Sequence, residues 1–253
     1  MIRKPLLIGH RGAMGYAPEN TPASFDLAWK LGVDAVECDL HLSKDGELVI
    51  MHDESLDRTT SGTGFIRDTP WSRIRSLDAG SWFHRRFRGQ RAWRLKDFLR
   101  WIRDKKNPEG RPLQPVLEIK NDKIRYPGIA DRVAEHLIDG DLSSRAWVIS
   151  FDHGSVKRVK ILQPKARTGL LFDRPLPDLA SRAKAMKADG IFPRWSLVTP
   201  ALVRKARKLG LFVATYTVNE GEQFNKVVGA GVDALTTNFP DRMRSLLQEQ
   251  SRR

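Results

Sequence analysis

The 253-residue sequence contains one cysteine, Cys38, and no long apolar segment. A single cysteine excludes intrachain disulfides, and with them a disulfide-stapled secreted scaffold, and it also excludes a cysteine-rich zinc module. No stretch approaches the roughly 18 apolar residues that span a membrane. The N-terminal MIRKPLLIGH begins with basic residues but has only about four consecutive apolar ones, fewer than the core of a signal peptide. We therefore expect a soluble cytoplasmic protein.

Acidic residues are in deficit, since 30 Asp and Glu oppose 44 Lys and Arg to give a net charge of +14. This balance favours contact with nucleic acid, an anionic membrane or a phosphate-bearing ligand. The densest cluster, HRRFRGQRAWRLK (residues 84–96), interleaves basic and aromatic residues, as single-stranded nucleic-acid sites do. The basic residues are otherwise scattered, so we expect a solvated basic surface and no nucleic-acid partner. The overlapping WFHRRFR, from Trp82, is compatible with weak electrostatic contact with an anionic membrane, and the oligomeric state stays open.

Short apolar runs alternate with longer helical patterns along the whole chain. We predict strands starting near Pro5, Ala35, Pro115, Ala146, Ala166, Asp189, Leu211 and Asp233. We predict helices starting near Pro22, Trp93, Gly128, Gly154, Leu176, Thr199, Glu220 and Pro240. Strict alternation is typical of a parallel sheet with crossover helices, and eight units in this length predict a TIM (β/α)8 barrel formed by residues 1–253 as a single domain. An open doubly wound sheet is the alternative, but no glycine-rich dinucleotide loop supports it.

One segment departs from the alternation. Lys44-Asp45-Gly46 predicts a tight turn into LVIMH (residues 48–52), and residues 53–92 then show little helical periodicity. We interpret this segment as a small insertion after the second strand, on the face where barrel loops build functional sites.

Charged residues occupy strand positions that are usually apolar. In VECDLHLSKDGELVIMHD (residues 36–53), Glu37 and Asp39 share one face of a strand, with their side chains roughly 6.6 Å apart. Glu118 and Lys120 likewise share one face of VLEIK. The apolar faces of these strands suit packing against helices, so we expect the charged side chains to point inward, towards the mouth of the barrel.

Three carboxylates gathered in one place require compensation. Two carboxylates about 6 Å apart repel by roughly 3 kcal/mol at an effective dielectric constant of about 20, so three pairs cost roughly 8 kcal/mol. Arg11 and Lys120 could compensate alone, as a structural ion network. Three acids that offer only oxygen ligands also suit a hard cation, whereas zinc more usually recruits histidine or cysteine. We favour one divalent cation, Mg²⁺ or Ca²⁺, bound by Glu37, Asp39 and Glu118.

Two histidines follow strands beside this acidic cluster. One histidine at such a position is usually structural, but His10 and His52 together favour a general acid and a general base. The sequence does not indicate which is which. Arg11 offers a bidentate fork to a phosphate, and Lys120 offers a point charge.

For other polar residues near the cluster, the sequence is compatible either with a role in supporting the site or with a purely local structural role. Asn20 either supports the site or caps the helix near Pro22, and Asp53 either orients His52 or starts a turn. Glu19 is a candidate supporting residue, and His41 has either a role at the rim or none. The remaining residues with a simple expectation are Cys38 in the core and His84, His136 and His153 on the surface.

Ordered motifs extend over nearly the whole chain. They are HRGAMGYAPENT from His10, the pair Glu37 and Asp39, Asp45-Gly46, HDESLDRTT from His52, LEIK from Leu117, SFD from Ser150, TVN from Thr217 and TNFP from Thr237. Together they resemble the glycerophosphodiester phosphodiesterase family. The resemblance implies a TIM barrel with a small insertion after the second strand. It also implies the following roles: metal ligands Glu37, Asp39 and Glu118, acid and base His10 and His52, and phosphate ligands Arg11 and Lys120.

The sequence departs from the family pattern at three points. Tyr216 stands where the family usually has tryptophan, which implies aromatic packing of Tyr216 against the glycerol. Asn238 stands where many members have aspartate, and AWRLKD (residues 92–97) lacks the usual Pro-Thr-Leu. These differences concern the specificity for the alcohol.

The resemblance implies metal-dependent hydrolysis of glycerophosphodiesters to sn-glycerol 3-phosphate and an alcohol. A cyclic-phosphate route and direct attack by water both stay open. One alternative is a lysophospholipase D-type reaction on lysolipids. Another is a catalytically dead, basic barrel that binds nucleic acid, against which the intact set of histidines, acids and lysine argues.

Overall fold

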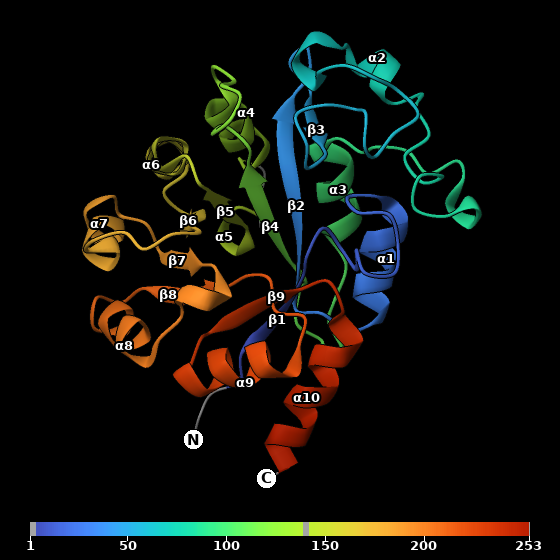
Figure 1. Ribbon diagram of the computed structural model, residues 1–253. Helices are drawn as coiled ribbons and strands as arrows, with labels where there is room; N and C mark the ends of the chain where they lie inside the picture. Colours follow the sequence, from blue (N-terminus) through green and yellow to red (C-terminus); the bar gives the residue numbers. More distant parts are fainter. Residues whose placement is uncertain (1–3, 139–141, 253) are drawn as a thin grey trace.

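Parallel strands close into a barrel in the computed structural model, which describes residues 4–138 and 142–252 (Figure 1). The barrel strands are β1 (Leu6–Gly9), β2 (Ala35–Leu42), β4 (Gln114–Ile119), β5 (Trp147–Ser150), β6 (Arg167–Phe172), β7 (Gly190–Pro193), β8 (Phe212–Thr215) and β9 (Ala234–Thr237). Strand β1 pairs with both β9 and β2, and this pairing closes the ring. A further strand, β3 (Leu48–Ile50), pairs antiparallel with β2 outside the ring. The predicted TIM barrel, with a hairpin after the second strand, is confirmed.

Helices follow the barrel strands and surround them (Figure 1). The longer ones are α1 (Pro22–Lys30), α3 (Leu95–Ile102), α4 (Ile129–His136), α6 (His153–Leu162), α7 (Leu179–Ala185), α8 (Pro200–Lys208), α9 (Gly221–Ala230) and α10 (Pro240–Arg252). Each begins within three residues of its predicted start. A short helix that the sequence did not predict, α5 (Leu142–Arg145), precedes β5. Within residues 4–138 and 142–252, no helix is both long and apolar enough to cross a membrane.

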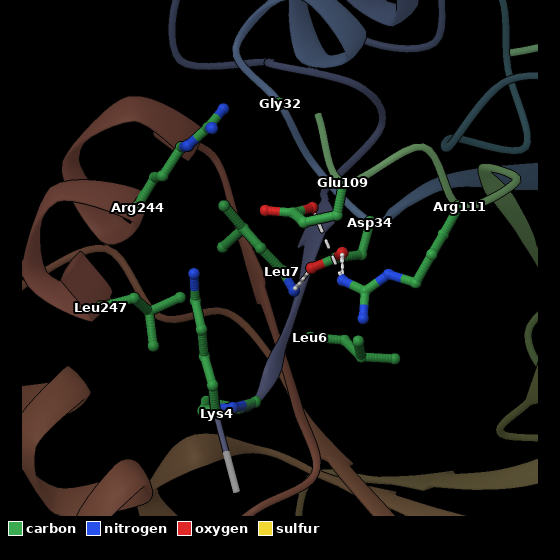
Figure 2. Close-up of a pocket in the computed structure, with 10 residues that line it drawn as sticks. Lys4, Leu6, Leu7, Gly32, Asp34, Glu109, Arg111, Arg244 and Leu247 are labelled. Atoms are coloured by element: carbon green, nitrogen blue, oxygen red, sulfur yellow. Dashed lines mark hydrogen bonds and ion pairs between the residues drawn. The ribbon is translucent and has the colours of Figure 1, made fainter. Parts of the chain in front are cut away.

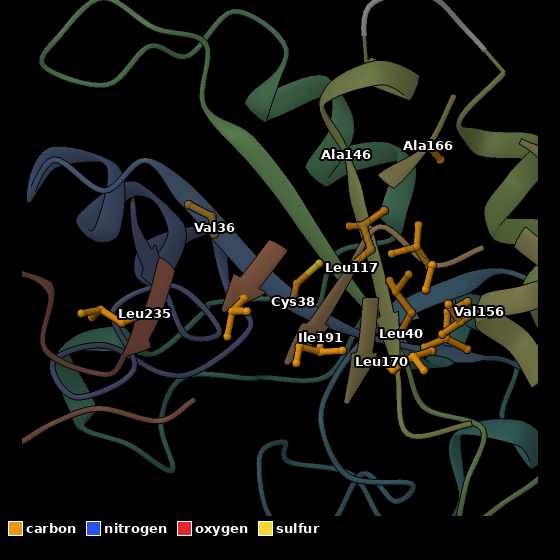
Figure 3. Packing of buried hydrophobic residues seen from close by; sticks show 14 of the residues in the cluster. Val36, Cys38, Leu40, Leu117, Ala146, Val156, Ala166, Leu170, Ile191 and Leu235 are labelled. Atoms are coloured by element: carbon orange, nitrogen blue, oxygen red, sulfur yellow. The ribbon is translucent and has the colours of Figure 1, made fainter. Parts of the chain in front are cut away.

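Side-chain alternation along the strands gives the barrel two apolar layers. The outer layer packs against the helices, and Figure 3 shows part of it, including Cys38, Leu40 and Leu117. Cys38 is fully buried there, as expected. The inner layer includes Ile8, Ala35, Val116, Trp147, Ile149, Leu171, Phe192, Ala214 and Ala234. Positions 37, 39 and 118 therefore continue the inner face beyond Ala35 and Val116, because side chains in a strand alternate with a period of two.

The insertion after β3 packs on its own apolar cluster. Its helical turns are η1 (Ile66–Asp68), α2 (Trp71–Ile74) and η2 (Arg85–Phe87). The cluster consists of Val49, Met51, Leu56, Ile66, Trp71, Ile74 and Ala92. Each turn has only three or four residues, too few for a helical period to be visible in the sequence. In Figure 1 the insertion lies beyond the C-terminal end of β2.

Candidate active site

Three carboxylates meet inside the C-terminal end of the barrel. Asp39 and Glu118 are direct partners in the register of β2 and β4, and Glu37 lies two residues before Asp39. One oxygen from each lies within 4.8 Å of the other two, and no other such group of potential metal ligands occurs in the part of the chain that the structure describes. All three residues are buried, with exposed fractions of 3%, 1% and 8% for Glu37, Asp39 and Glu118. The sequence prediction that these acids converge is therefore correct.

The surrounding cations compensate the three acids unequally. Arg11 Nε lies 3.2 Å from Asp39 Oδ2, and Lys120 Nζ lies 3.5 Å from Asp39 Oδ1 and 2.7 Å from Glu118 Oε1. Glu37 accepts only the backbone N–H of Arg11, at 2.8 Å from Oε2. Burial opposes ionisation of Asp39, but Arg11 and Lys120 outweigh it and hold its pKa below the usual range. Burial and the charges of Asp39 and Glu118 raise the pKa of Glu37 well above its usual range.

Two acceptor oxygens in this cluster lack a donor. Glu37 Oε1 and Asp39 Oδ1 are buried and receive no hydrogen bond. Three carboxylates face two cations, so a structural ion network of Arg11 and Lys120 leaves one negative charge uncompensated. Buried oxygens without donors, in a set that offers only oxygen, fit a hard divalent cation of the Mg²⁺ or Ca²⁺ type.

Each of the two candidate histidines is oriented by a hydrogen bond through Nδ1. His10 Nδ1 lies 2.7 Å from Asn238 Oδ1, and His52 Nδ1 lies 2.7 Å from Asp53 Oδ1. Amide and carboxylate oxygens only accept, so Nδ1 carries the proton in both rings and Nε2 is left for proton exchange. Asp53 therefore contacts His52, in agreement with the hypothesis that Asp53 orients this histidine. Asn238, noted in the sequence only as a departure from the family pattern, is the partner of His10.

The partners of the two histidines differ in charge. Burial, reinforced by the charge of Arg11, lowers the pKa of His10 to about 3, so His10 is neutral near pH 7. A hydrogen bond from Arg58 Nε to Asp53 Oδ2, 2.6 Å long, holds the pKa of Asp53 below its usual range. Asp53 is therefore an anionic acceptor for the Nδ1–H of His52, whereas Asn238 offers His10 only a neutral dipole.

Polar residues from the loop after β1 support Arg11 and Asp39. Asn20 Nδ2 donates to Asp39 Oδ2 at 2.8 Å, and Thr21, not Asn20, caps α1. Glu19 is 5% exposed and pairs with Arg11 at 2.9 Å and with Arg58 at 2.7 Å. Arg58, which the sequence analysis did not single out, thus connects the partner of Arg11 with the partner of His52.

His41 holds the backbone of His52. It is completely buried, and its Nε2 lies 3.1 Å from the carbonyl oxygen of His52. Since a carbonyl only accepts, Nε2 carries the proton, and Nδ1 accepts from the hydroxyl of Tyr126 at 3.0 Å. Burial lowers the pKa of His41 to about 4. His41 therefore has a positioning contact, and Tyr126 is a residue that the sequence analysis missed.

The sequence of residues 10–242 matches the glycerophosphoryl diester phosphodiesterase family. The chain belongs to this family. A glycerophosphodiester phosphodiesterase of Caldanaerobacter subterraneus subsp. tengcongensis is 35% identical, over 97% of this chain and 99% of the relative. A glycerophosphodiester phosphodiesterase of Bacillus subtilis is 34% identical, over 93% of this chain and 84% of the relative. Family membership makes the protein an enzyme that hydrolyses phosphoric diesters.

Solved structures of this phosphodiesterase family share the fold over almost the full chain. The Oleispira antarctica phosphodiesterase, in complex with the product sn-glycerol 3-phosphate, is 28% identical and superposes with a TM-score of 0.85, covering 96% of this chain and 97% of that one. A glycerophosphodiester phosphodiesterase of Agrobacterium tumefaciens is also 28% identical, with a TM-score of 0.80 and coverage of 95% and 99%. The fold and the family assignment thus agree.

Tyr216 follows β8 at the mouth of the barrel. Its ring meets that of Phe151 edge to face, with 6.2 Å between centroids. Its hydroxyl lies 3.1 Å from the carbonyl oxygen of Phe172 and donates to it. The half-buried ring therefore offers an apolar face, since its polar end is already engaged by the backbone.

A separate cleft of about 210 Å³ lies at the opposite, N-terminal end of the phosphodiesterase barrel (Figure 2). Its lining includes Asp34, which accepts from the Leu7 N–H at 2.9 Å, from Asn107 Nδ2 at 2.7 Å and from Arg111 at 2.9 Å. Asp34 is thus engaged in joining β1 to neighbouring loops. The cleft contains no histidine, so the acid–base chemistry belongs to the other end.

The remaining histidines are less uniform than the sequence predicted. His84 is exposed, as expected, whereas His136 is half-exposed and its Nδ1 lies 2.8 Å from the carbonyl oxygen of Arg132. His153 is likewise half-exposed, and its Nε2 lies 3.0 Å from the carbonyl oxygen of Leu171, so all three histidines reach the surface, as expected, but two of them contact a backbone carbonyl.

Proposed function

We propose that the protein hydrolyses glycerophosphodiesters to sn-glycerol 3-phosphate and an alcohol, with one divalent cation held by Glu37, Asp39 and Glu118. The observation that carries this proposal is the pair of buried, donor-free oxygens on Glu37 and Asp39 at the mouth of a family-typical barrel. The product bound to the Oleispira relative supports the same substrate class.

The charged residues of the site stabilise the phosphodiester in two ways: the three acids hold the cation, and Arg11 and Lys120 bind phosphoryl oxygens directly. When bound, the cation supplies Lewis-acid stabilisation of negative charge on the phosphoryl oxygens. Arg11 and Lys120 bind the remaining phosphoryl oxygens and stabilise the charge that develops in the transition state. Their own contacts with Asp39 and Glu118 keep both cations fixed within the site before substrate binds.

The partners of the two histidines support different roles for them. His10 is neutral, carries its proton on Nδ1 and has Nε2 available, so it acts as the general base. His52 donates Nδ1–H to the anionic Asp53, which fixes the orientation of its ring, and it acts as the general acid on the leaving alkoxide. The base takes its proton either from the glycerol 2-hydroxyl, giving a cyclic phosphate, or from water.

Tyr216 packs against the glycerol through its ring, because its hydroxyl is engaged with Phe172. Phe151 lies edge-on to it and extends the same apolar wall.

The assignment of the chain to one domain and its cytoplasmic location remain predictions from the sequence.

Lysolipid hydrolysis is a second candidate because an exposed aromatic side chain, Trp82, borders the site through Arg58. A catalytically dead nucleic-acid-binding barrel is disfavoured, since binding alone requires neither the three acids nor the oriented histidines.

A comparison of kcat/KM values tests whether the enzyme prefers soluble diesters or lysolipids. The enzyme is given glycerophosphocholine, glycerophosphoethanolamine and lysophosphatidylcholine in separate assays with Mg²⁺ or Ca²⁺, and kcat/KM is measured for each. We expect at least about tenfold higher kcat/KM for the two deacylated diesters. A preference for the lysolipid would move the substrate class to the second candidate.

A further inference from the structure

The insertion carries an uncompensated group of arginines. Residues 79–96 contain no acid, and Arg85, Arg86, Arg88 and Arg91, here called the arginine patch, are all exposed. In the part of the chain that the structure describes, no carboxylate forms an ion pair with any of these four side chains. Arg94, a few residues further on, is by contrast paired with Asp97 at 3.1 Å. The arginine patch is therefore a local source of positive potential, beyond the general excess of basic residues.

Aromatic side chains are interleaved with the arginine patch. Trp82 is 38% exposed, and its indole N–H donates to the carbonyl oxygen of Ala79 at 3.0 Å. Phe83 lies edge-on to Trp82 and to Phe87, with centroid separations of 5.6 and 5.7 Å. A partly exposed indole with its polar end satisfied, set among arginines, is the composition of a surface that rests at a lipid–water boundary.

The same packing argues against stacked nucleobases. The Arg86 guanidinium lies over the ring of Phe87 at 4.7 Å, and that of Arg58 lies over Trp82 at 5.8 Å. Single-stranded nucleic-acid sites need open ring faces on which bases stack. Here guanidinium groups lie over two of the rings, and the third packs against both of them.

Arg58 and Arg86 connect Trp82 and the arginine patch to the residues around the active site. Arg58, which lies over Trp82, binds both Asp53 and Glu19, the partners of His52 and Arg11. Arg86 donates to the carbonyl oxygen of Tyr16, in the loop after β1. In Figure 1 this part of the insertion, at the right-hand edge, projects away from the barrel.

We propose that Trp82 and the arginine patch dock the enzyme on an anionic lipid bilayer. The charge complementarity and the exposed indole carry the docking, which does not depend on the substrate. Only its purpose, bringing the mouth of the barrel close to diesters released at a membrane, rests on the proposed function.

Vesicle co-sedimentation tests the docking. The intact protein is mixed with vesicles of phosphatidylcholine alone, or of phosphatidylcholine with 30 mol% phosphatidylglycerol, at 0.1 M and 1 M NaCl. We expect binding to the anionic vesicles only, and its loss at 1 M NaCl, where the screening length falls from ~10 Å to ~3 Å. Binding that is equal on neutral vesicles, or that persists at 1 M NaCl, would overturn the proposal.

A matched pair of variants separates the arginine patch from net charge. Arg85→Gln/Arg88→Gln removes two patch charges, and Arg182→Gln/Arg204→Gln removes two exposed charges from α7 and α8 on the far side of the barrel (Figure 1). Each arginine near an anionic surface is worth roughly a fivefold change in affinity, so we expect roughly 25-fold weaker binding for the patch variant. The affinity of the control variant for anionic vesicles should change by less than about threefold. Adding Trp82→Ala to the patch variant should weaken its binding further.

Three further measurements keep the outcomes distinct. Equal losses in the two double variants would assign the binding to net charge and overturn the docking site, as would tighter binding to oligo(dT) than to anionic vesicles. Thermal unfolding checks that both variants fold. Turnover of soluble glycerophosphocholine is measured separately, so a failure of the proposed function would be visible as absent turnover with vesicle binding intact.

Discussion

Glu37 and Asp39 lie two positions apart on β2, yet their surroundings favour opposite protonation states. Asp39 faces Arg11 and Lys120 and accepts a hydrogen bond from Asn20, and its pKa is lowered. Glu37 receives one backbone N–H and no side-chain cation, and its pKa is raised. Of these two carboxylates, Glu37 is therefore the one without a compensating cation, and we expect the bound cation to have its largest effect there.

Replacing Glu37 by glutamine should therefore have two opposite effects. The variant keeps an acceptor for the N–H of Arg11 but removes a carboxyl group whose pKa is raised in the folded state, which costs stability at pH 8, where this group is ionised in the unfolded chain; we therefore expect the metal-free protein at pH 8 to be more stable by about 1–2 kcal/mol. At the same time, the rise in Tm that Mg²⁺ or Ca²⁺ produces should disappear. Differential scanning calorimetry with EDTA and with each cation measures both effects.

The exposed Glu135→Gln on α4 is the control for that experiment, since it removes one negative charge away from the site. A purely structural ion network predicts the reverse result. Breaking such a network costs about 3–5 kcal/mol, so a loss of that size in the metal-free Glu37→Gln variant would contradict a metal site.

The roles of His10 and His52 should be distinguishable by comparing substrates whose leaving groups do and do not need a proton. With glycerophosphocholine, His10→Asn and His52→Asn should each lower kcat by about 10²–10⁴. With the 4-nitrophenyl ester of glycerol phosphate, whose leaving group needs no proton, His52→Asn should recover to within about tenfold of wild type and His10→Asn should not. The exposed His84→Asn should behave as wild type. The opposite pattern would exchange the two roles.

Asn238→Asp should move the acid limb of the pH profile. Burial and Arg11 lower the pKa of His10 to about 3, and a carboxylate at position 238 would favour the imidazolium and raise that pKa. Since the base must be neutral, the acid limb of kcat/KM should shift upward by about one pH unit or more. The exposed Asn225→Asp on α9 is the matched control. An unchanged acid limb would remove His10 from the base role.

His41 should make the metal-free protein sensitive to mild acid. Its pKa is about 4 in the folded state and about 6.5 when unfolded, so the unfolded state binds more protons and stability falls as the pH drops through this window. Between pH 7 and pH 5 we expect His41 to account for about 2 kcal/mol of lost stability. Urea unfolding in EDTA should show that His41→Gln loses about that much less than wild type or the exposed His84→Gln. An equal loss in all three proteins would contradict this assignment.

The barrel and its acidic cluster could be predicted because strand periodicity and barrel closure act together. Cys38 and Leu40 must face the helices, so Glu37 and Asp39 must face the interior. The parallel pairing of β2 with β4 then brings Glu118 opposite Asp39. These relationships follow from a period of two and a parallel sheet, which short sequence patterns reveal.

The supporting contacts could not be predicted because they depend on loops without a period. Arg58 lies in the irregular insertion, and only the path of that loop brings it to Glu19 and Asp53. Tyr126 reaches His41 from a loop far away in sequence. Asn238 was visible in the sequence as a substitution, but its contact with His10 requires the pairing of β1 with β9.

The most direct test of the metal-dependent reaction is release of sn-glycerol 3-phosphate from glycerophosphocholine after EDTA treatment and after adding back Mg²⁺ or Ca²⁺. Wild type and Glu135→Gln should lose activity in EDTA and regain it with one or both cations, while Glu37→Gln should stay at least about 100-fold below them in either cation. Undiminished release in EDTA, or full activity of Glu37→Gln, would contradict the assignment of the three acids to a metal site.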